Sequence, residues 1–283
     1  MSNIKLSVVI ATLGGDCLKQ TIQSLLSGLI IPDEILICIP DTHSQNATPF
    51  SSSIVKVIAT EVKGQVKQRA YGFTQTKYPL VLQLDDDILL EKDTIKEMIG
   101  FLKSLGKGNV VAPIYYGQRS GICIHALRNG FIKNLFDFFI CAAPWGVKKM
   151  GIVSKIGLNY GVDNTFCTES LQHCDWIPGG CVLSFKEDLV LQDFFPFTGK
   201  AYCEDIYHSF FRKQAGTKLW VATGIKVFIE EPEPEFSPAA VEKVIAIRRY
   251  FIKLIKGPQW RLSIYEIFCR MRSKRYAKKL DNK

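Results

Sequence analysis

Short apolar runs alternate with helical segments through residues 7–229. The runs at Ser7–Thr12, Glu34–Ile39 and Ile54–Ala59 are rich in Val and Ile and have the length of buried strands. Helices are expected at about 17–27, where apolar residues recur at helical spacing, and at about 65–76. Strands that alternate with helices across short polar turns predict a mainly parallel sheet covered on both faces.

The same pattern continues in the second half with one poorly patterned stretch. We expect helices at about 92–104, 131–140 and 203–214, and strands at 109–114, after Gly180, and at 218–221 and 225–229. Within residues 115–174 only the 131–140 helix stands out, because one of its faces is very aromatic. That face fits core packing, the wall of an acceptor site or a membrane-facing patch, and core packing is the commonest.

One apolar run, Tyr78–Leu84, leads directly into Asp85, Asp86 and Asp87. Adjacent carboxylates at the end of a buried strand repel one another and lose solvation, so a compensating group is expected. A divalent cation with hard oxygen ligands is the usual compensation, and it would carry substrate phosphates as well. An acidic, solvated turn that caps the next helix is the alternative.

The positive charge of the chain is concentrated at its C-terminal end. Residues 239–283 hold thirteen Lys and Arg against three Asp and Glu, whereas the remainder holds 23 against 24. A nearly neutral body with a basic extension indicates an anionic surface as a partner. No apolar run is long enough to span a bilayer, no signal-peptide pattern precedes the first strand, and nine scattered cysteines suit a reducing cytosol.

Four ordered signals together resemble the family-2 glycosyltransferases of the GT-A fold over roughly residues 7–229. The signals are the Ser7–Thr12 run, Lys63-Gly64-Gln65 through Arg69, Leu84 through Asp87, and Trp176 through Gly180 leading to Cys203-Glu204-Asp205. The resemblance implies an α/β fold with a Rossmann-like, nucleotide-binding, mainly parallel sheet. It divides the chain into a catalytic domain at 1–230 and a basic helical extension at 231–283.

The resemblance also implies a donor site. Ala11, Thr12 and Asp41 would bound the base and ribose of a nucleotide sugar. Arg69 would lie near the diphosphate, where a planar cation suits phosphate oxygens. The backbone at Gly179 and Gly180 would let the donor sugar approach closely.

The family's Asp-x-Asp motif corresponds to Asp85 and Asp87, with Asp86 between them. One outer carboxylate would touch the sugar and ribose, and the other would hold Mn²⁺ or Mg²⁺ against the diphosphate. Asp205 matches the catalytic base of the inverting enzymes, which takes a proton from the acceptor hydroxyl. The alternative for Glu204 and Asp205 is an ordinary acidic pair at a helix N-terminus.

Three positions depart from the family pattern. The second strand ends in a single acid, Asp41, and Ala70 follows Arg69 where Asn is frequent. No histidine lies some two dozen residues after Asp205, where most relatives place a metal ligand, and counting leads instead to Glu230. Glu230 would serve as an oxygen ligand for the metal, or it is a solvated residue of an acidic loop.

The basic extension admits several interpretations. Apolar stripes at 244–255 and 264–268 are flanked by Lys and Arg. They fit two helices packed on the catalytic domain with a solvated basic face, or an interfacial anchor on anionic lipid. Arg248 or Arg249 would alternatively close over the donor diphosphate. Nucleic acid is not expected as a partner, because no recognised binding module accompanies the charge.

These observations predict a metal-dependent, inverting glycosyltransferase. Its donor would be a UDP-, GDP- or dTDP-sugar and its acceptor a glycan or lipid-linked saccharide, at the cytoplasmic face of a membrane in surface-polysaccharide or lipopolysaccharide assembly. The first alternative is a nucleotidyltransferase, although the loop Leu13-Gly14-Gly15-Asp16 lacks the expected Lys or Arg. The second is a membrane-associated scaffold that keeps the fold but has lost metal binding.

Overall fold

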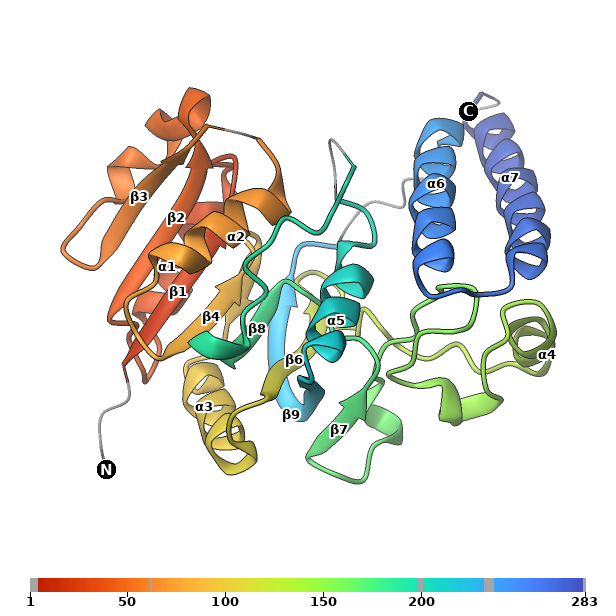
Figure 1. Cartoon of the computed structure of the whole chain (residues 1–283), viewed down its shortest axis with the longest axis horizontal. Helices are drawn as coiled ribbons and strands as arrows, with labels where there is room; N and C mark the ends of the chain where they lie inside the picture. The colour runs from red at the N-terminus through yellow and green to blue at the C-terminus, as the bar shows by residue number, and fades with distance from the viewer. Residues whose placement is uncertain (1–4, 62, 198–200, 232–236, 282–283) are drawn as a thin grey trace.

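A nine-stranded mixed sheet forms the centre of the computed structural model, which describes residues 5–61, 63–197, 201–231 and 237–281 (Figure 1). The strand order is β3-β2-β1-β4-β8-β6-β9-β5, and β7 pairs with β9 off this path. The strands are β1 (Leu6–Ala11), β2 (Glu34–Pro40), β3 (Val55–Thr60), β4 (Leu80–Leu84), β5 (Ile88–Leu90), β6 (Asn109–Gly117), β7 (Leu171–Cys174), β8 (Cys181–Phe185) and β9 (Lys218–Ile229). Neighbours in β3-β2-β1-β4 are parallel, as are β6 and β9, whereas β5, β7 and β8 run antiparallel to their neighbours.

Helices cover both faces of the sheet. The α-helices are α1 (Cys17–Leu26), α2 (Gln65–Gln75), α3 (Thr94–Leu105), α4 (Phe131–Phe139), α5 (Glu204–Gln214), α6 (Pro238–Leu254) and α7 (Gln259–Asp281). Apolar residues of α1 and α3 pack with alternate residues of β1 and β4 in the main core, while Phe73 of α2 packs with Val9 and Val81 on the opposite face. Because both faces are covered, all six residues of β1 are buried and the strand is almost continuously apolar. The mainly parallel, helix-covered α/β sheet expected from the sequence is confirmed.

The sheet differs from the prediction at its β9 side. The strands expected at 218–221 and 225–229 are one continuous strand, β9, and a shift of its pairing with β6 between Ala112 and Ile114 accommodates the irregularity. β5 has only three residues and was not predicted, because so short a run has no readable period. It pairs antiparallel with the last residues of β9.

The chain beyond residue 237 forms a pair of helices, α6 and α7, that stand side by side at one end of the molecule (Figure 1). One apolar cluster joins Ile247 and Phe251 of α6 to Ile206 and Tyr207 of α5 and to Cys141, which follows α4. The two helices therefore pack on the rest of the chain, as one interpretation of the basic extension expected. The expected boundary at 230–238 lies partly outside the described residues.

None of the described helices combines the length and the apolar character that a membrane span requires. All nine cysteines lie in described segments and all are free. The aromatic helix expected at 131–140 is present as α4, but the core interpretation of its aromatic face is wrong. The side chains of Phe131, Ile132, Phe138 and Phe139 are exposed, whereas Asn134 and Asp137 are buried.

Candidate functional site

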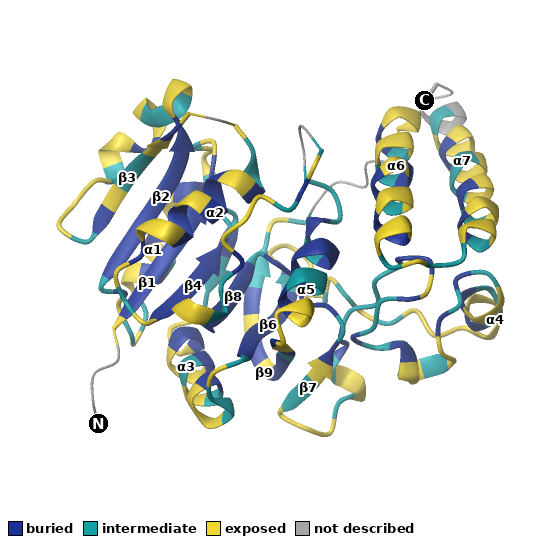
Figure 2. Ribbon diagram, viewed as in Figure 1, coloured by how far each residue is buried: buried dark blue, intermediate teal, exposed yellow. Residues whose placement is uncertain are grey.

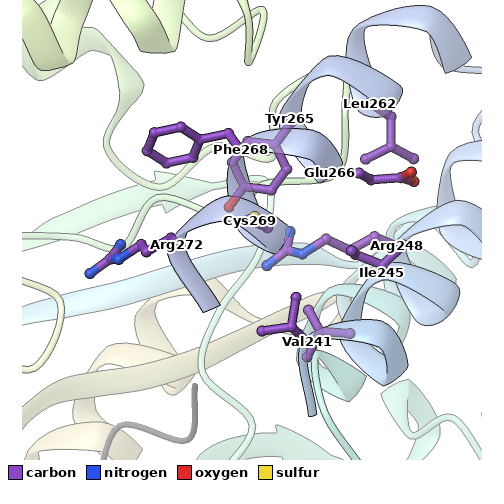
Figure 3. A pocket seen from close by; sticks show the side chains of 10 residues that line it. Val241, Ile245, Arg248, Leu262, Tyr265, Glu266, Phe268, Cys269 and Arg272 are labelled. Carbon is purple, nitrogen blue, oxygen red and sulfur yellow. The ribbon is translucent and has the colours of Figure 1, made fainter. Parts of the chain in front are cut away.

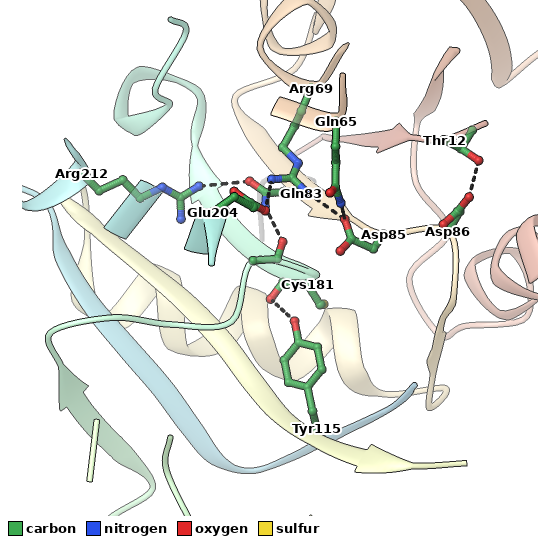
Figure 4. Close-up of polar contacts among 11 residues, drawn as sticks. Thr12, Gln65, Arg69, Gln83, Asp85, Asp86, Tyr115, Cys181, Glu204 and Arg212 are labelled. Atoms are coloured by element: carbon green, nitrogen blue, oxygen red, sulfur yellow. Dashed lines mark hydrogen bonds and ion pairs between the residues drawn. The ribbon is translucent and has the colours of Figure 1, made fainter. Parts of the chain in front are cut away.

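The three adjacent carboxylates lie where two central strands end. Asp85 follows the last residue of β4, and Thr12 follows the last residue of its parallel neighbour β1. The Thr12 hydroxyl donates a hydrogen bond to the Asp86 carboxylate (Figure 4). The Thr21 hydroxyl donates to the Asp86 carbonyl at 2.7 Å. The carboxyl ends of parallel strands are where ligands of such sheets gather. The fold therefore presents the acids at an edge suited to ligand binding.

Arg69 links the first acid to the start of α5. Its guanidinium donates to Asp85 at 2.9 Å and to Glu204 at 2.8 Å, and the side chain is buried (Figure 4). Burial opposes the charged form, but the carboxylates of Glu204 and Asp85 raise the pKa of Arg69. Arg69 therefore joins Asp85 to Glu204 at the start of α5. Its expected place near the diphosphate stays a prediction.

Gly179 and Gly180, which precede β8, leave room for two carboxylates close to the backbone. One carboxylate comes from Asp205 of α5 and the other from Asp85, which follows β4. A Cβ on Gly179 would lie 2.4 Å from Oδ1 of Asp205, and a Cβ on Gly180 would lie 3.2 Å from Oδ2 of Asp85. The Asp85 amide also donates to the Gly180 carbonyl at 2.7 Å. The structure shows these glycines making room for carboxylates. Their close approach to a donor sugar stays a prediction.

Asp205 lies in the first turn of α5, beside Glu204. The residue before them, Cys203, has a φ of 58°, a left-handed conformation that is unusual for a residue other than glycine. This turn starts the helix with its two acids next to Gly179. Burial, together with the neighbouring Glu204 and Asp85 carboxylates, raises the pKa of Asp205 well above its usual range. A carboxylate destabilised in this way is a strong base once it ionises.

Strand pairing places Glu230 opposite Asp87. Ile88 of β5 is paired antiparallel with Ile229 of β9, so the residue before Ile88 faces the residue after Ile229. Burial and the neighbouring carboxylates of Asp85, Asp86 and Glu230 raise the pKa of Asp87 to about 7. Glu230 also accepts from the Cys17 thiol at 3.5 Å. The position found by counting from Asp205 thus reaches the acid cluster, a proximity that no pattern in the sequence showed.

Among the described residues, no three His, Cys, Asp or Glu side chains converge tightly enough to hold a metal ion on their own. Mg²⁺ is commonly held by one or two carboxylates, with water and substrate phosphates completing its octahedron. Asp87 and Glu230 provide two carboxylates whose mutual repulsion a cation would relieve, and Asp85 stands beside them. The residues present therefore fit a divalent cation that binds together with a diphosphate.

Three glutamine amides and a second arginine form a hydrogen-bond network around the acids. Gln65 donates to Asp85 at 3.2 Å, and Gln68 donates to the carbonyls of Thr12 at 2.9 Å and Cys38 at 2.8 Å. Gln83 donates to the Gly179 carbonyl and accepts from Arg212 at 3.4 Å. Burial and the nearby Arg69 lower the pKa of Arg212 to about 9. A glutamine within the apolar β4 run was the signal in the sequence that could have revealed this network.

The other predicted donor residues lie around the same edge without joining the acid cluster. Ala11 is buried as the last residue of β1, and Asp41 is exposed at the start of the 3₁₀ helix Asp41–Asn46. Cavities beside α2 are lined by residues 59–61, Lys67, Gln68 and Tyr71 on one side and by residues 63–67, Asp193, Phe195–Phe197 and Ala201 on the other. Both cavities lie next to Gln65 or Gln68, and therefore next to the residues that contact Asp85 and Thr12.

The arginines of α6 are occupied elsewhere. Arg248 donates to the Gly157 carbonyl at 2.5 Å and lines a cavity between α6 and α7, which Figure 3 shows together with Glu266. Arg249 forms a two-pronged ion pair with Glu266 of α7. In this structure both guanidiniums therefore hold the helices in place, and closure of either arginine over a diphosphate stays a prediction.

Comparisons with known proteins bear on the family and the fold. The sequence model described as glycosyl transferase family 2 matches residues 7–152, slightly more than half of the chain. No curated protein sequence is similar enough to count as a match. Similar solved structures include GalNAc-T7 with UDP, GalNAc and Mn²⁺, and TarS from S. aureus in complex with UDP-GlcNAc.

The likeness to these two structures is one of fold. GalNAc-T7 is 15% identical with a TM-score of 0.56, covering 86% of this chain and 48% of its own. TarS is 16% identical with a TM-score of 0.55, covering 87% of this chain and 65% of its own. The chain thus spans between about half and two thirds of the length of these proteins. The GT-A fold expected from the sequence is confirmed.

Proposed function

The chain belongs to glycosyl transferase family 2, and from that premise we propose that it transfers one sugar from a nucleotide-sugar donor to a glycan or lipid-linked acceptor, with inversion. The observation that carries the proposal is the meeting of Asp85 and Asp205 across Gly179 and Gly180. Two carboxylate elements from distant parts of the sequence face one another where the central strands end. The proposal keeps residues 1–230 as the catalytic domain and 231–283 as its helical extension.

The donor would occupy the edge formed by the ends of β1, β2 and β4. Ala11, Thr12 and Asp41 would bound the base and ribose of a UDP-, GDP- or dTDP-sugar, and Asp86 already accepts from Thr12 there. The two similar structures bear UDP or UDP-GlcNAc, which supports a nucleotide-sugar donor without selecting the base. Arg69 would act on the diphosphate indirectly, by fixing Asp85.

A divalent cation would be held by Asp87, with Glu230 and Asp85 beside it, and by the donor diphosphate. When bound, Mn²⁺ or Mg²⁺ neutralises the charge that develops on the departing nucleoside diphosphate. The raised pKa of Asp87 supports this assignment, because a carboxyl crowded by like charges is relieved by a cation. GalNAc-T7 was crystallised with Mn²⁺, which is consistent with such a site.

Asp205 would act as the general base. Its carboxylate would take the proton of the acceptor hydroxyl as that oxygen attacks the anomeric carbon from the face opposite the leaving diphosphate. Direct displacement of this kind forms the new glycosidic bond as the old bond to phosphate oxygen breaks, and so inverts the configuration. The raised pKa of Asp205 suits it to this task, and the Arg69–Glu204 pair keeps α5 in position.

The proposal for the acceptor rests on the positive charge of the C-terminal helices. The basic helices α6 and α7 support an anionic membrane as a partner and a lipid-linked saccharide as acceptor. We therefore propose that the enzyme works peripherally on the cytoplasmic face of a membrane, in assembly of a surface polysaccharide or lipopolysaccharide.

The test is release of nucleoside diphosphate from a panel of UDP-, GDP- and dTDP-sugars, with mixed glycolipids as acceptors. One donor should support acceptor-dependent release. Asp205→Asn should abolish it while leaving donor affinity nearly unchanged, since the amide keeps the shape but cannot take a proton. Full activity in Asp205→Asn would show that the base is another group.

A further inference from the structure

Helix α4 has its polar and apolar faces inverted relative to an ordinary surface helix. Ile132 is 82% exposed and Phe131 is 70% exposed, and Phe138 and Phe139 are exposed about two turns later. The buried positions of the helix are Asn134 and Asp137. A surface helix normally turns its apolar stripe to the core, so this helix presents its apolar stripe to whatever surrounds the protein.

Buried polar contacts hold α4 in this orientation. The Lys149 ammonium, which is itself buried, donates to Asn134 at 2.8 Å and to Asp137 at 2.7 Å. Lys133 forms a second ion pair with Asp137. Turning the helix over would leave Lys149 buried without its partners, which costs far more than exposing aromatic rings. The outward aromatic face is therefore fixed by the fold.

The exposed apolar surface continues onto the loop after α4 and onto α7. Trp145, itself exposed, packs edge-on against Phe131 and Phe138. The ring of Phe136 of α4 packs at a tilt against that of Phe268 of α7, with 4.9 Å between the ring centroids. From there a helical stripe of α7 is exposed at Trp260, Ile264, Ile267, Phe268 and Met271. Figure 2 shows the exposed residues on α4 and along α7, at the end of the molecule farthest from β3. We call this the α4–α7 surface.

The exposed charges on the segments that form the α4–α7 surface have one sign. Within residues 127–149 and 259–277, the acids are Asp137 and Glu266, and both are buried. The same segments expose six cations: Arg128, Lys133, Lys148, Arg272, Lys274 and Arg275. A second copy of the chain would oppose these cations with identical ones, because a two-fold interface pairs a patch with itself. An anionic bilayer complements both the apolar stripe and the cations.

We propose that the α4–α7 surface docks on the surface of an anionic lipid bilayer, with the aromatic side chains of α4, Trp145 and the α7 stripe inserted at the level of the headgroups. This deepens the membrane part of the proposed function by naming the contact surface, and it changes the assignment: α4 joins the basic extension as an anchor. Apolar residues of α4, α5 and α7 share one cluster. The anchor therefore belongs to the same apolar cluster as the helix that begins with Glu204 and Asp205.

The experiment compares co-sedimentation of the full chain with vesicles of phosphatidylcholine alone and vesicles that contain about one third phosphatidylglycerol. The variant is Ile132→Ser/Phe138→Ser/Phe139→Ser. The matched control is Leu29→Ser/Ile31→Ser, whose side chains are 60% and 55% exposed beside α1, at the opposite end of the molecule (Figure 1). Neither variant touches a residue placed in the catalytic site.

The wild type and the control should partition equally onto the anionic vesicles, and less at high salt. The triple variant should partition about tenfold less or worse, because three inserted side chains lose their apolar burial. Donor binding, measured without vesicles, should be the same in all three proteins. A failure of donor binding in the wild type would count against the proposed function and leave the docking result standing.

Three results would overturn the docking proposal. The first is a wild type that does not bind anionic vesicles, and the second is a triple variant that binds them as well as the wild type does. The third is a wild type that is dimeric in solution while the triple variant is monomeric. If the triple variant does not fold, brominated lipid gives a second readout in the wild type. Trp145 and Trp260 are exposed and should be quenched, whereas buried Trp176 should not. Absence of quenching would also reject the proposal.

Discussion

Replacing Gly179 by alanine should separate the catalytic role of the site from its structural role. The new Cβ would lie 2.4 Å from Oδ1 of Asp205 and 3.1 Å from Oε1 of Glu204, whereas ordinary contacts begin near 3.4 Å. The Asp205 carboxylate must therefore move by about 1 Å, and a misplacement of that size costs about a hundredfold in rate. The atom displaced is the tip of a flexible side chain, so the free energy of unfolding should fall by less than about 1 kcal/mol.

The assay is steady-state transfer, with thermal unfolding measured in parallel. Gly179→Ala should lower kcat about a hundredfold and leave donor binding unchanged. Gly100→Ala is the matched control, because its Cβ would meet nothing within 4 Å and alanine favours the interior of α3. A Gly179→Ala enzyme with activity within about threefold of the wild type would refute the reasoning that Asp205 must keep this position to act.

Three further predictions concern the charged residues of the site. Arg69→Met should lower the free energy of unfolding by about 3–5 kcal/mol in urea titrations, since Asp85 and Glu204 lose their shared partner, and an unchanged stability would contradict the bridging role. Asp87 has a pKa raised to about 7, so the folded protein binds the proton of this carboxyl more tightly than the unfolded chain does. Without metal, the free energy of unfolding should therefore fall as pH rises from about 4 to about 7. Asp87→Asn should remove this fall, which differential scanning fluorimetry would detect. The affinity for Mn²⁺ should rise with pH through the same range, because a protonated Asp87 does not bind the metal. Glu230→Gln should weaken Mn²⁺ binding at least several-fold in calorimetry. Equal Mn²⁺ affinity in Glu230→Gln and the wild type would show that Glu230 is only a solvated residue.

The sequence predicted the elements whose patterns are strong. β1, β4 and α2 lie close to where their apolar runs and turns placed them, and the acids after Leu84 stand at the end of a buried strand as expected. These features depend on local pattern and on the rule that ligands gather where parallel strands end. The family resemblance then drew attention to Asp205, more than a hundred residues away.

The features that the sequence did not predict depend on contacts across the chain. The pairing of β5 with β9, which brings Glu230 to Asp87, involves a strand of three residues with no period to read. Arg69 of α2 bridges to Glu204 of α5. These two helices lie far apart in the sequence, so no local pattern indicates that they meet. Helix α4 shows a further limit. Its periodicity predicted a helix with an aromatic face, but periodicity does not say which face is turned to the core.

Calorimetric titration of the protein with UDP, GDP and dTDP, first with Mn²⁺ and then with EDTA, tests the central claim most directly. The account predicts micromolar binding of one nucleotide that is lost or greatly weakened when EDTA removes the metal. That result would identify the base of the donor and establish the carboxylate cluster as its metal-dependent site. Binding of none of the three, with or without metal, would contradict the account and favour a scaffold that keeps the fold without the chemistry.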